Sequence, residues 1–439
     1  MAPLILNSSL INFCVYGLGT TGMSVINYFN REKFTDYRIW DDDKVRRAFH
    51  GFDIEEKKGK KIFSQHLNST DYIIVSPGIS LKKAKLKKQL IKNKHKIITD
   101  LDLFYLFYPK IKSIVVTGTN GKSTTCKILE HVLKRNKINI RLGGNIGKPV
   151  LDLDLKKQPL VIIEASSFQL AYSQFVRPDY AIILNITNDH LDWHGSTKEY
   201  INSKFKIFSN QKKNNFAFIN NKILLRKFKK DKYKSKLKFV NLEKYKNVKN
   251  RINNDYLNSE ANEENMSFVY ALSKILKINE KSLINSLKSF KGLPHRHEIF
   301  YKRNNKIFIN DSKATSFEAS KFALKSNKNI FWIVGGLPKK GDRFQLGKIK
   351  KNIIKTYIIG KHMENFKRHL KGKVDLQLCM TLKNAIISIF NDTRNITSRT
   401  ITVLLSPASA SYDQFRNFEE RGNYFKNLVK KKFKQKSNV

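Results

Sequence analysis

The sequence predicts an α/β protein of three domains: a Rossmann-like N-terminal domain, a central P-loop ATPase-like α/β domain and a C-terminal Rossmann-like α/β domain. Short apolar runs alternate with helical patterns along the chain, which is typical of βαβ units and parallel sheets. This pattern begins again after Pro109 and after residues 292–294. A chain of 439 residues is long enough for two to four domains. We therefore expect domains over residues 1–108, 109–292 and 293–439.

The first domain opens with a glycine loop between a strand and a helix. We expect strands over 11–16, 37–40 and 72–75 and a helix over 23–30, with the loop Gly-Leu-Gly-Thr-Thr-Gly at 17–22. Asp41 follows the second strand. This context favours a nucleotide diphosphate at the helix N-terminus, with Asp41 near a ribose or base. A purely structural tight turn is the alternative.

The central domain carries the strongest motif, Thr-Gly-Thr-Asn-Gly-Lys-Ser-Thr at 117–124. It joins a strand expected over 113–116 to a helix that we expect to begin at Thr124. Backbone N–H groups of such a loop bind phosphates, while Lys122 can neutralise the outer ones and Ser123 can ligate magnesium. The full GxxxxGK[ST] spacing is absent because Val116 stands at the first glycine position. A chance glycine turn would need the lysine and serine placed by accident as well, so we predict a phosphate loop.

Polar residues follow two further strands of this domain, expected over 160–163 and 180–184. Glu164 ends the first, and Asp189 and His190 come shortly after the second. Each taken singly is explained as a capping or satisfied polar residue. Together, on strands that flank a phosphate loop, they favour a metal site, because hard cations need carboxylate oxygen.

Two lysine-bearing segments of the central domain are less informative. Lys204 falls on a helix expected over 199–209, and the residues alone do not distinguish it from a solvated surface lysine. The lysine-dense stretch 222–251 has a poor period, so we expect a solvated hairpin or surface insertion there.

In the C-terminal domain we expect strands over 306–309, 330–334, 356–359 and 400–405. The bend at 292–298 carries Arg296, whose guanidinium can hold a phosphate bidentately. The loop 310–315 has a carboxylate, an ammonium and a hydroxyl close together, and 406–411 has small side chains and hydroxyls suited to a substrate carboxylate. For each loop alone, a structural and a functional explanation are equally good. Because all three lie at strand ends of one domain, together they predict a site.

Composition and charge bound the function class. Hydrophobic residues make up 41% and charged residues 27%, as in folded soluble proteins. Three cysteines without ligand spacing, no basic leader and no apolar run of membrane-spanning length predict a cytoplasmic protein without membrane insertion. The 84 Lys and Arg against 36 Asp and Glu give a net charge of +48, a reason to consider nucleic acid. The lysines are spread over every segment, however, so compositional drift is the preferred explanation.

A series of motifs in order resembles the Mur ligase family over nearly the whole chain: GLGTTG, SPGI, TGTNGKST, GGNIGKP, EASSFQL, NITNDH, GLPHRHE, INDSKAT, SPASASYDQF and NFEERG. The last four indicate the member that adds D-glutamate. The resemblance implies a three-domain enzyme of peptidoglycan precursor synthesis. It would join D-glutamate to UDP-N-acetylmuramoyl-L-alanine while ATP is hydrolysed to ADP and phosphate, with two Mg²⁺ ions.

The resemblance also assigns roles to residues of this chain. It implies catalytic roles for Lys122, His190 and Lys204, and magnesium ligation by Ser123, Glu164, His190 and Lys204. The residues implied to bind ATP are Gly118, Thr119, Asn120, Gly121, Lys122, Ser123, Thr124, Arg296 and Asp311. Those implied for the UDP-muramoyl substrate are Leu18, Thr21, Asp41, Ser76, Pro77, Gly78, Asn145, Ser166 and Gln169. Those implied for D-glutamate are Lys313, Thr315, Lys339, Ser411 and Phe418.

Lys204 aligns with a lysine that is carboxylated by carbon dioxide in this family, giving a carbamate that ligates the second magnesium. That chemistry requires a neutral amine in a desolvated, cation-rich site. One departure is visible: the family often has a His-Asn pair near the end of the central domain, where this chain has Glu264 and Asn265.

Three alternative functions differ in testable ways. Another muramoyl-peptide ligase or a folylpolyglutamate synthase would share the phosphate loop, but the N-terminal glycine loop argues against the folate enzyme and SPASAS with FEERG against the other muramoyl ligases. A basic nucleic-acid-binding ATPase would bind DNA or RNA with a steep salt dependence. A dinucleotide oxidoreductase leaves the phosphate loop unexplained. We expect small-molecule substrates, no nucleic-acid partner and a monomer.

Overall fold

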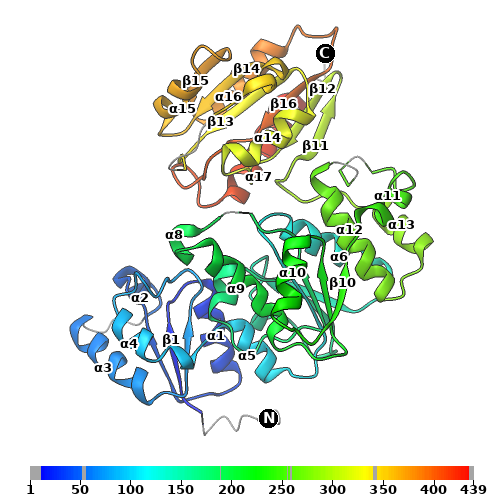
Figure 1. Ribbon diagram of the computed structural model, residues 1–439. Coiled ribbons are helices and arrows are strands. Elements are labelled where there is room, and N and C mark those ends of the chain that lie inside the picture. Colours follow the sequence, from blue (N-terminus) through cyan, green and yellow to red (C-terminus); the bar gives the residue numbers. More distant parts are fainter. Residues whose placement is uncertain are drawn as a thin grey trace. The chain divides into compact units, whose positions relative to one another are not determined.

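The computed structural model describes residues 11–51, 56–187, 189–254, 256–257, 260–339 and 344–434. The chain divides into two compact units, Met1–Phe290 and Lys291–Val439. Figure 1 shows an α/β architecture in both, with two sheets in the first unit and one in the second. The predicted fold class is therefore confirmed.

The N-terminal sheet is parallel, in the order β2 (Tyr37–Trp40), β1 (Phe13–Tyr16), β3 (Tyr72–Val75) and β4 (Ile97–Ile98). Side chains alternate along β1, as the strand period of two requires. Phe13 and Val15 pack with helices α1 (Thr20–Arg31) and α5 (Asp100–Phe107), whereas Cys14 and Tyr16 pack with α3 (Glu56–Ser69) and α4 (Lys87–Lys92). The short helix α2 (Lys44–Phe49) follows β2. The glycine loop thus follows a buried strand and leads into a helix, as expected, but α1 begins at Thr20, three residues earlier than predicted, so residues 20–22 belong to the helix.

The central sheet is parallel, in the order β10 (Lys236–Phe239), β9 (Phe216–Ile219), β8 (Tyr180–Ile183), β5 (Ser113–Thr117), β7 (Leu160–Glu164) and β6 (Ile140–Gly144). Helix α6 (Lys122–Arg135) begins two residues earlier than predicted. Further helices of this part include α7 (Ser167–Tyr172), α8 (Leu191–His194), α9 (Thr197–Ser209), α12 (Glu260–Ile275) and α13 (Glu280–Lys288). One apolar core runs from Phe13 of the first sheet to Val115 of the second and Phe205 of α9, so the two sheets share their packing.

The prediction of a hairpin or surface insertion over 222–251 is wrong. This stretch forms α10 (Lys222–Lys230), strand β10 and α11 (Leu242–Lys249), and β10 is the edge strand of the central sheet. Asn221 caps α10, and Leu224 and Phe228, four residues apart, are buried on one side of it. The abundant lysines hide this short apolar stripe in the sequence.

The sheet of the second unit has the order β11 (Glu298–Arg303), β12 (Lys306–Asn310), β16 (Ile401–Leu405), β13 (Ile330–Gly335), β14 (Ile353–Ile359) and β15 (Leu376–Met380). All neighbours are parallel except the β11 and β12 pair. Trp332 faces α14 (Phe317–Ser326) and α15 (Met363–Leu370), and Phe331 faces α16 (Leu382–Thr393) and α17 (Phe418–Lys434). Strands β11 and β15 were not predicted, because their exposed positions interrupt the apolar pattern.

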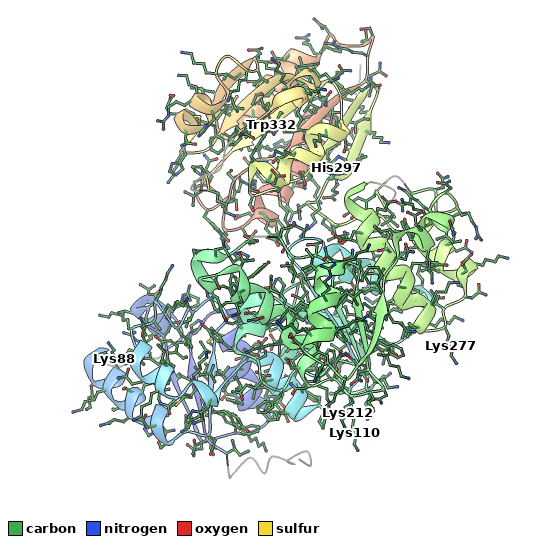
Figure 2. All side chains as sticks on the ribbon, in the orientation of Figure 1. Lys88, Lys110, Lys212, Lys277, His297 and Trp332 are labelled. Atoms are coloured by element: carbon green, nitrogen blue, oxygen red, sulfur yellow. The ribbon has the colours of Figure 1, made fainter. Side chains whose placement is uncertain are left out.

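The basic residues are spread over the surface. Lys88, Lys110, Lys212 and Lys277 are exposed on four separate segments of the first unit and project outward (Figure 2). Cys14, Cys126 and Cys379 are buried free thiols. Within the described ranges, no helix combines the length and the apolar character needed to cross a membrane.

Candidate functional site

The phosphate loop joins the end of β5 to the start of α6, so the free N–H groups of the helix's first turn face the loop. Gly121 has a φ of +83°, and a side chain there would collide with Asn265, which explains the glycine. The amide nitrogens of Thr119 and Asn120 donate to Asn185, each at 2.9 Å. The loop is therefore held in shape by the residue that follows β8.

Two lysines converge on this loop. Lys122 Nζ donates to the carbonyl oxygens of Gly118 and Thr119, each at 2.9 Å. Lys204 Nζ, on α9, donates to the same Gly118 oxygen at 2.8 Å and lies 4.6 Å from the ring centroid of Tyr200. Lys204 is only 1% exposed. Burial and the Lys122 charge lower the pKa of Lys204 to about 7, so much of this amine is neutral near neutral pH.

Glu164 provides an unused carboxylate oxygen beside the loop. It ends β7, directly opposite Val116 of β5 in the sheet, and is 2% exposed. Its Oε1 accepts a 2.9 Å hydrogen bond from Asn145 Nδ2, while Oε2 is buried without a partner among the described residues. A buried carboxylate oxygen left in this way fits a hard cation as its missing partner.

The predicted metal set fits magnesium by chemistry. Ser123 is buried at the second position of α6, Glu164 is the last residue of β7, and His190 lies on the segment after β8. Across the described ranges there is no group of three His, Cys, Asp or Glu side chains that could hold a metal. A metal site here would therefore need a ligand of another kind besides Glu164 and His190, such as the Ser123 hydroxyl.

His190 precedes the short helix α8, and His194 is its last residue. His190 has a φ of +53°, and its ring lies 4.7 Å from that of Phe168. His194 is buried and its Nε2 lies 3.0 Å from Ser167 Oγ. Burial, with the neighbouring His190 and Lys204 charges, lowers the pKa of His194 to about 4, so this side chain is neutral at neutral pH.

A cavity of about 420 Å³ opens at the glycine loop of the N-terminal sheet. It lies where β1 and β3 end, and Ser76 Oγ donates to Gly17 O at 2.8 Å across that point. Of the residues predicted for the UDP-muramoyl substrate, the lining includes Thr21, Ser76, Pro77, Gly78, Asn145, Ser166 and Gln169. The structure therefore brings together residues that are up to 148 positions apart, since Thr21 and Gln169 line the same cavity.

The other two residues predicted for this substrate lie behind the cavity wall. Leu18 is 2% exposed and its backbone nitrogen donates to Asp41 Oδ2 at 2.7 Å. Asp41 Oδ1 accepts from the backbone nitrogen of Asp43 at 2.8 Å. Neither is among the lining residues, so in this structure Asp41 shapes the glycine loop.

Gln169 is held in one orientation from both ends. Its Oε1 accepts from the backbone nitrogen and the hydroxyl of Ser166, each at 3.1 Å, while its Nε2 donates to Asp100 at 3.2 and 3.3 Å. Burial raises the pKa of Asp100 to about 6, although the Gln169 hydrogen bond opposes the shift. The N-terminal and central segments thus meet through a buried carboxylate under the cavity.

The residues in place of the family's His-Asn pair also contact this region. Glu264 accepts from Asn185 Nδ2 at 2.6 Å and from Asn220 Nδ2 at 2.7 Å. Asn265 is buried beside Gly121. Glu264 therefore supports Asn185, which in turn holds the phosphate loop.

In the second unit, the residues predicted for D-glutamate surround the carboxyl ends of the strands. Lys313 Nζ lies 4.5 Å from the ring centroid of Phe418, and Ser411 is buried in the loop after β16. Thr315 and Lys339 are exposed on the loops after β12 and β13. The predicted set is thus distributed around one end of one sheet.

Arg296 and Asp311, predicted to bind ATP, lie in neighbouring loops of this unit. Asp311 accepts from the backbone nitrogen of His297 at 3.0 Å and from Ser406 Oγ at 2.7 Å. Burial raises its pKa to about 7, with the Arg296 charge opposing the shift. Asp311 therefore joins the loop before β11 to the loop after β16.

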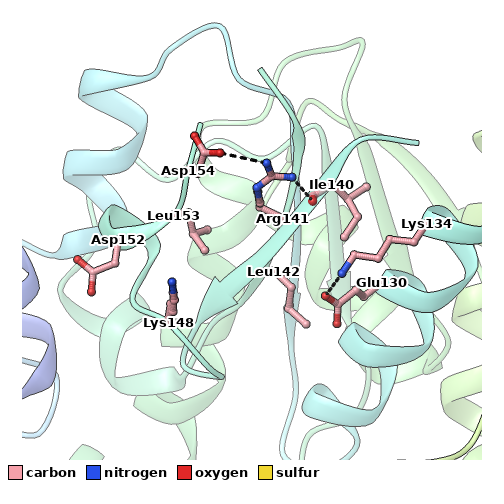
Figure 3. Close-up of a pocket in the computed structure, with 9 residues that line it drawn as sticks. All are labelled: Glu130, Lys134, Ile140, Arg141, Leu142, Lys148, Asp152, Leu153 and Asp154. Carbon is pink, nitrogen blue, oxygen red and sulfur yellow. Dashed lines mark hydrogen bonds and ion pairs between the residues drawn. The ribbon is translucent and has the colours of Figure 1, made fainter. Parts of the chain in front are cut away.

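A second cavity, of about 400 Å³, lies at the edge strand β6 (Figure 3). Its cations are largely neutralised by its own acids: Arg141 pairs with Asp154 at 3.2 Å and Lys134 with Glu130 at 2.8 Å. No residue of the predicted site lines it.

Sequence reasoning missed Arg46 and Tyr200. Arg46 lines the cavity at the glycine loop, within 3.9 Å of Asp41 Oδ2. Its sequence signal is weak, since it is one of many basic residues and only the fold brings α2 to the loop. Tyr200 lies under Lys204 and its hydroxyl is 3.0 Å from Thr119 Oγ1. Its position four residues before Lys204 on a helix was the available signal.

Comparisons with known proteins agree with this arrangement. Residues 11–99 match the family model "Mur ligase MurD-like, N-terminal domain", and residues 116–290 match "Mur ligase middle domain". Two curated relatives are UDP-N-acetylmuramoylalanine--D-glutamate ligases: the protein from Wolbachia sp. subsp. Brugia malayi and that from Rickettsia felis. Each is 34% identical to this chain; the first comparison covers 95% of both chains, the second 95% of this chain and 96% of the relative.

Two solved structures have similar folds. A MurF ligase from Thermotoga maritima in complex with ADP has a TM-score of 0.56 at 16% identity, covering 86% of this chain and 93% of that one. The UDP-N-acetylmuramate-alanine ligase MurC from Thermotoga maritima has a TM-score of 0.52 at 16% identity, covering 96% and 99%. The fold, the phosphate loop and the near full-length relatives agree: this chain belongs to the Mur ligase family.

Proposed function

We propose that this chain is the ATP-dependent ligase that adds D-glutamate to UDP-N-acetylmuramoyl-L-alanine in peptidoglycan precursor synthesis. The observation that carries the proposal is the convergence of Lys122, Lys204 and Glu164 on one phosphate loop. Relatives at 34% identity that carry this activity in their names support the choice of substrates.

ATP would bind with its phosphates at residues 118–124. Lys122, which is folded onto two loop carbonyls at 2.9 Å, would exchange those contacts for the β- and γ-phosphates. Ser123, Glu164, His190 and a carboxylated Lys204 would hold magnesium, which neutralises phosphate charge when bound. The unpartnered Oε2 of Glu164 supports this assignment.

Lys204 is suited to carboxylation because its amine loses its proton readily. A neutral Nζ attacks the carbon of CO₂: an N–C bond forms, one C=O π bond opens and one N–H proton leaves to solvent, so the neutral amine becomes an anionic carbamate. Burial and Lys122 lower the pKa of Lys204 to about 7, which supplies the neutral amine. The anion would then be stabilised by Lys122 and by the bound metal.

The chemistry requires an activated carboxylate, because a carboxylate is a poor electrophile. Its oxygen attacks the γ-phosphorus of ATP, the bond to ADP breaks, and an acyl phosphate forms. The neutral amine of D-glutamate attacks the acyl carbon, its nitrogen loses a proton, the C–O bond to phosphate breaks, and an amide remains as phosphate leaves. Lys122 would stabilise the charge on the transferred phosphoryl group, and Asn145, Ser166 and Gln169 would orient the muramoyl peptide.

We assign the three domains to residues 1–108, 109–292 and 293–439, binding the UDP moiety, ATP and D-glutamate respectively. The cavity at the glycine loop supports the first assignment, because it has room for a sugar diphosphate and carries Arg46. Lys313, Thr315, Lys339, Ser411 and Phe418 would bind D-glutamate, and Arg296 and Asp311 would contact ATP. We expect a cytoplasmic protein, since ATP and nucleotide-linked sugars are cytoplasmic metabolites. We also expect a monomer without a nucleic-acid partner.

The test is phosphate release from ATP by the purified protein with magnesium. UDP-N-acetylmuramoyl-L-alanine and D-glutamate are supplied separately and together, with L-glutamate and nucleic acid as controls. Release that needs both substrates and rejects L-glutamate is the expected result. Release stimulated by another amino acid or by nucleic acid would overturn the substrate assignment.

A further inference from the structure

Arg421 is a buried arginine at the carboxyl end of the second unit's sheet. It lies on α17, within the FEERG segment, and is 1% exposed. Its Nε donates to Ser312 Oγ at 3.0 Å, and its Nη2 donates to the carbonyl oxygens of Ser312 at 2.8 Å and Ser409 at 3.0 Å. One side chain therefore ties the loop after β12 to the loop after β16.

The third loop of this sheet end lies against the same guanidinium. Gly336 follows β13 with a φ of +134°, and a side chain there would lie 3.2 Å from Arg421 Nη1. Ser312 Oγ, which accepts from Arg421, donates to the carbonyl oxygen of Phe418 at 2.8 Å. Arg421 is thus at the centre of the loops that carry Lys313, Lys339 and Ser411, with Phe418 fixed through Ser312.

Among the described residues Arg421 forms no salt bridge, although the nearby charge of Asp413 partly opposes the lowering of its pKa by burial. Its hydrogen-bond partners are hydroxyl and carbonyl oxygens. The Nη1 atom of Arg421 is buried and has no hydrogen-bond partner among the described residues. Burial lowers the pKa of Arg421 to about 10, so the group stays protonated at neutral pH.

A buried cation without a directly paired carboxylate is costly, and an apolar side chain would pack at lower cost. Asp413 offsets part of the charge of Arg421, and a substrate carboxylate in the amino-acid site would offset more of it. D-Glutamate carries two carboxylates, and the residues predicted to bind it lie in the loops that Arg421 joins. The positive field of Arg421 would therefore favour the dicarboxylate as it enters.

We propose that Arg421 is a positioning residue of the amino-acid site: it holds the loops after β12 and β16 beside the loop after β13, and its charge favours a carboxylate-bearing amino acid there. This inference rests on the proposed function, because D-glutamate is the amino acid named by it.

The test compares the Michaelis constants of three variants. Arg421→Gln removes the charge and keeps some hydrogen-bonding capacity. Arg421→Lys keeps the charge but replaces the planar guanidinium, with its several N–H donors, by a single ammonium group. Lys426→Gln is the matched control, since it removes a cation from the same helix, where Lys426 pairs with Glu298 at 3.0 Å. KM is measured for D-glutamate, ATP and UDP-N-acetylmuramoyl-L-alanine. The acyl phosphate is trapped with hydroxylamine in the absence of amino acid.

Arg421→Gln should raise KM for D-glutamate by about 10- to 100-fold, the range expected for hydrogen bonds that involve a charged group. Arg421→Lys should fall between this variant and wild type, and Lys426→Gln should match wild type. The KM values for ATP and the UDP substrate, and the yield of trapped hydroxamate, should not change. This pattern separates a role in the amino-acid site from a role in folding alone.

An unchanged KM for D-glutamate in Arg421→Gln would overturn the inference. A parallel loss in all three KM values and in hydroxamate, together with a lower melting temperature, would do the same. If Arg421→Gln does not fold, Arg421→Lys is used instead: a KM for D-glutamate that does not change in Arg421→Lys would overturn the inference. Failure of the wild-type enzyme to use D-glutamate overturns the proposed function instead, and the variants are then compared with the amino acid that does support phosphate release.

Discussion

Lys204 Nζ donates a 2.8 Å hydrogen bond to the carbonyl oxygen of Gly118, so a buried amine of α9 contacts the phosphate loop directly. Arginine at position 204 would keep the positive charge but could not form the carbamate. We expect Lys204→Arg to lose about 100-fold or more in activity, similar to the loss of a preorganised charge in other active sites. Wild-type activity should rise through pH 7, because the amine, whose pKa is lowered to about 7, loses its proton there.

The proposed carbamate can be tested directly by NMR with ¹³C-labelled bicarbonate. Wild type should show an additional carbamate carbon resonance that is absent from Lys204→Arg and unchanged in Lys206→Arg, a lysine on the same helix that donates to Ala171 O. A labelled resonance that persists in Lys204→Arg would contradict the assignment.

Glu164→Gln tests the metal assignment. The amide keeps the size of the side chain and its bond to Asn145, but replaces the unpartnered carboxylate with a weaker metal ligand. We expect about a 100-fold loss of activity, partly recovered at high magnesium. The measurement is a magnesium titration of phosphate release. The control is Glu130→Gln, because the native Glu130 pairs with Lys134 at the second cavity. An unchanged magnesium dependence would exclude Glu164 as a ligand.

Asp100→Asn should change the pH dependence of stability. Burial raises the pKa of Asp100 from 3.8 to about 6. Between these two pH values the folded protein binds more protons than the unfolded chain, so the free energy of unfolding falls as the pH rises through this range. Removing the titrating group should stabilise the protein above pH 6 relative to pH 4, by at most about 3 kcal/mol. Denaturant unfolding at both values of pH measures the difference. An identical pH profile in both proteins would contradict this account.

Arg46→Gln should weaken binding of the UDP substrate. Arg46 lines the cavity at the N-terminus of α1, where a diphosphate would gain a charge-assisted hydrogen bond, so we expect KM for that substrate to rise about 10-fold. KM for ATP and D-glutamate should stay the same. Arg38→Gln, which removes an exposed arginine of β2 that pairs with Asp36 at 3.8 Å, is the control. Equal effects of both variants would indicate a general charge effect.

Gly422→Ala tests the packing of α17. A side chain at 422 would collide with His295 Nδ1 and approach the side chain of Asn310 to 3.0 Å, so we expect a loss of about 1–3 kcal/mol in the free energy of unfolding. Asn423→Ala, at the exposed neighbouring position, should change stability little. Thermal unfolding of the two variants gives the comparison, and equal melting temperatures would show that the helix can shift to make room.

The sequence was sufficient for the parts of the site that depend on local order. The phosphate loop and the glycine loop each follow a short apolar strand and precede a helix, so their residues and their surroundings are adjacent in the chain. The seven cavity residues predicted from the resemblance required motifs from two domains, and the structure brings them to one wall.

The remaining features depend on packing between distant segments. Lys204 is one of many lysines until α9 packs against the loop after β5, which buries its amine and lowers its pKa. Arg421 likewise occurs in a charged segment, and it is buried only because α17 packs against the end of the sheet. Neither effect has a periodic signature in the sequence.

Strand β10 has a further consequence for the behaviour of the chain in solution. It is the outermost strand of the six-stranded central sheet, with one row of backbone groups facing away from β9. Its Lys236 and Lys238 are exposed, and their amines lie 5.7 and 5.9 Å from the ring centroid of Phe216 on the neighbouring strand. A charged edge of this kind resists pairing with the strand of a second molecule, because two such edges would bring like charges together. The lysine-dense segment thereby protects the central sheet against edge-to-edge aggregation.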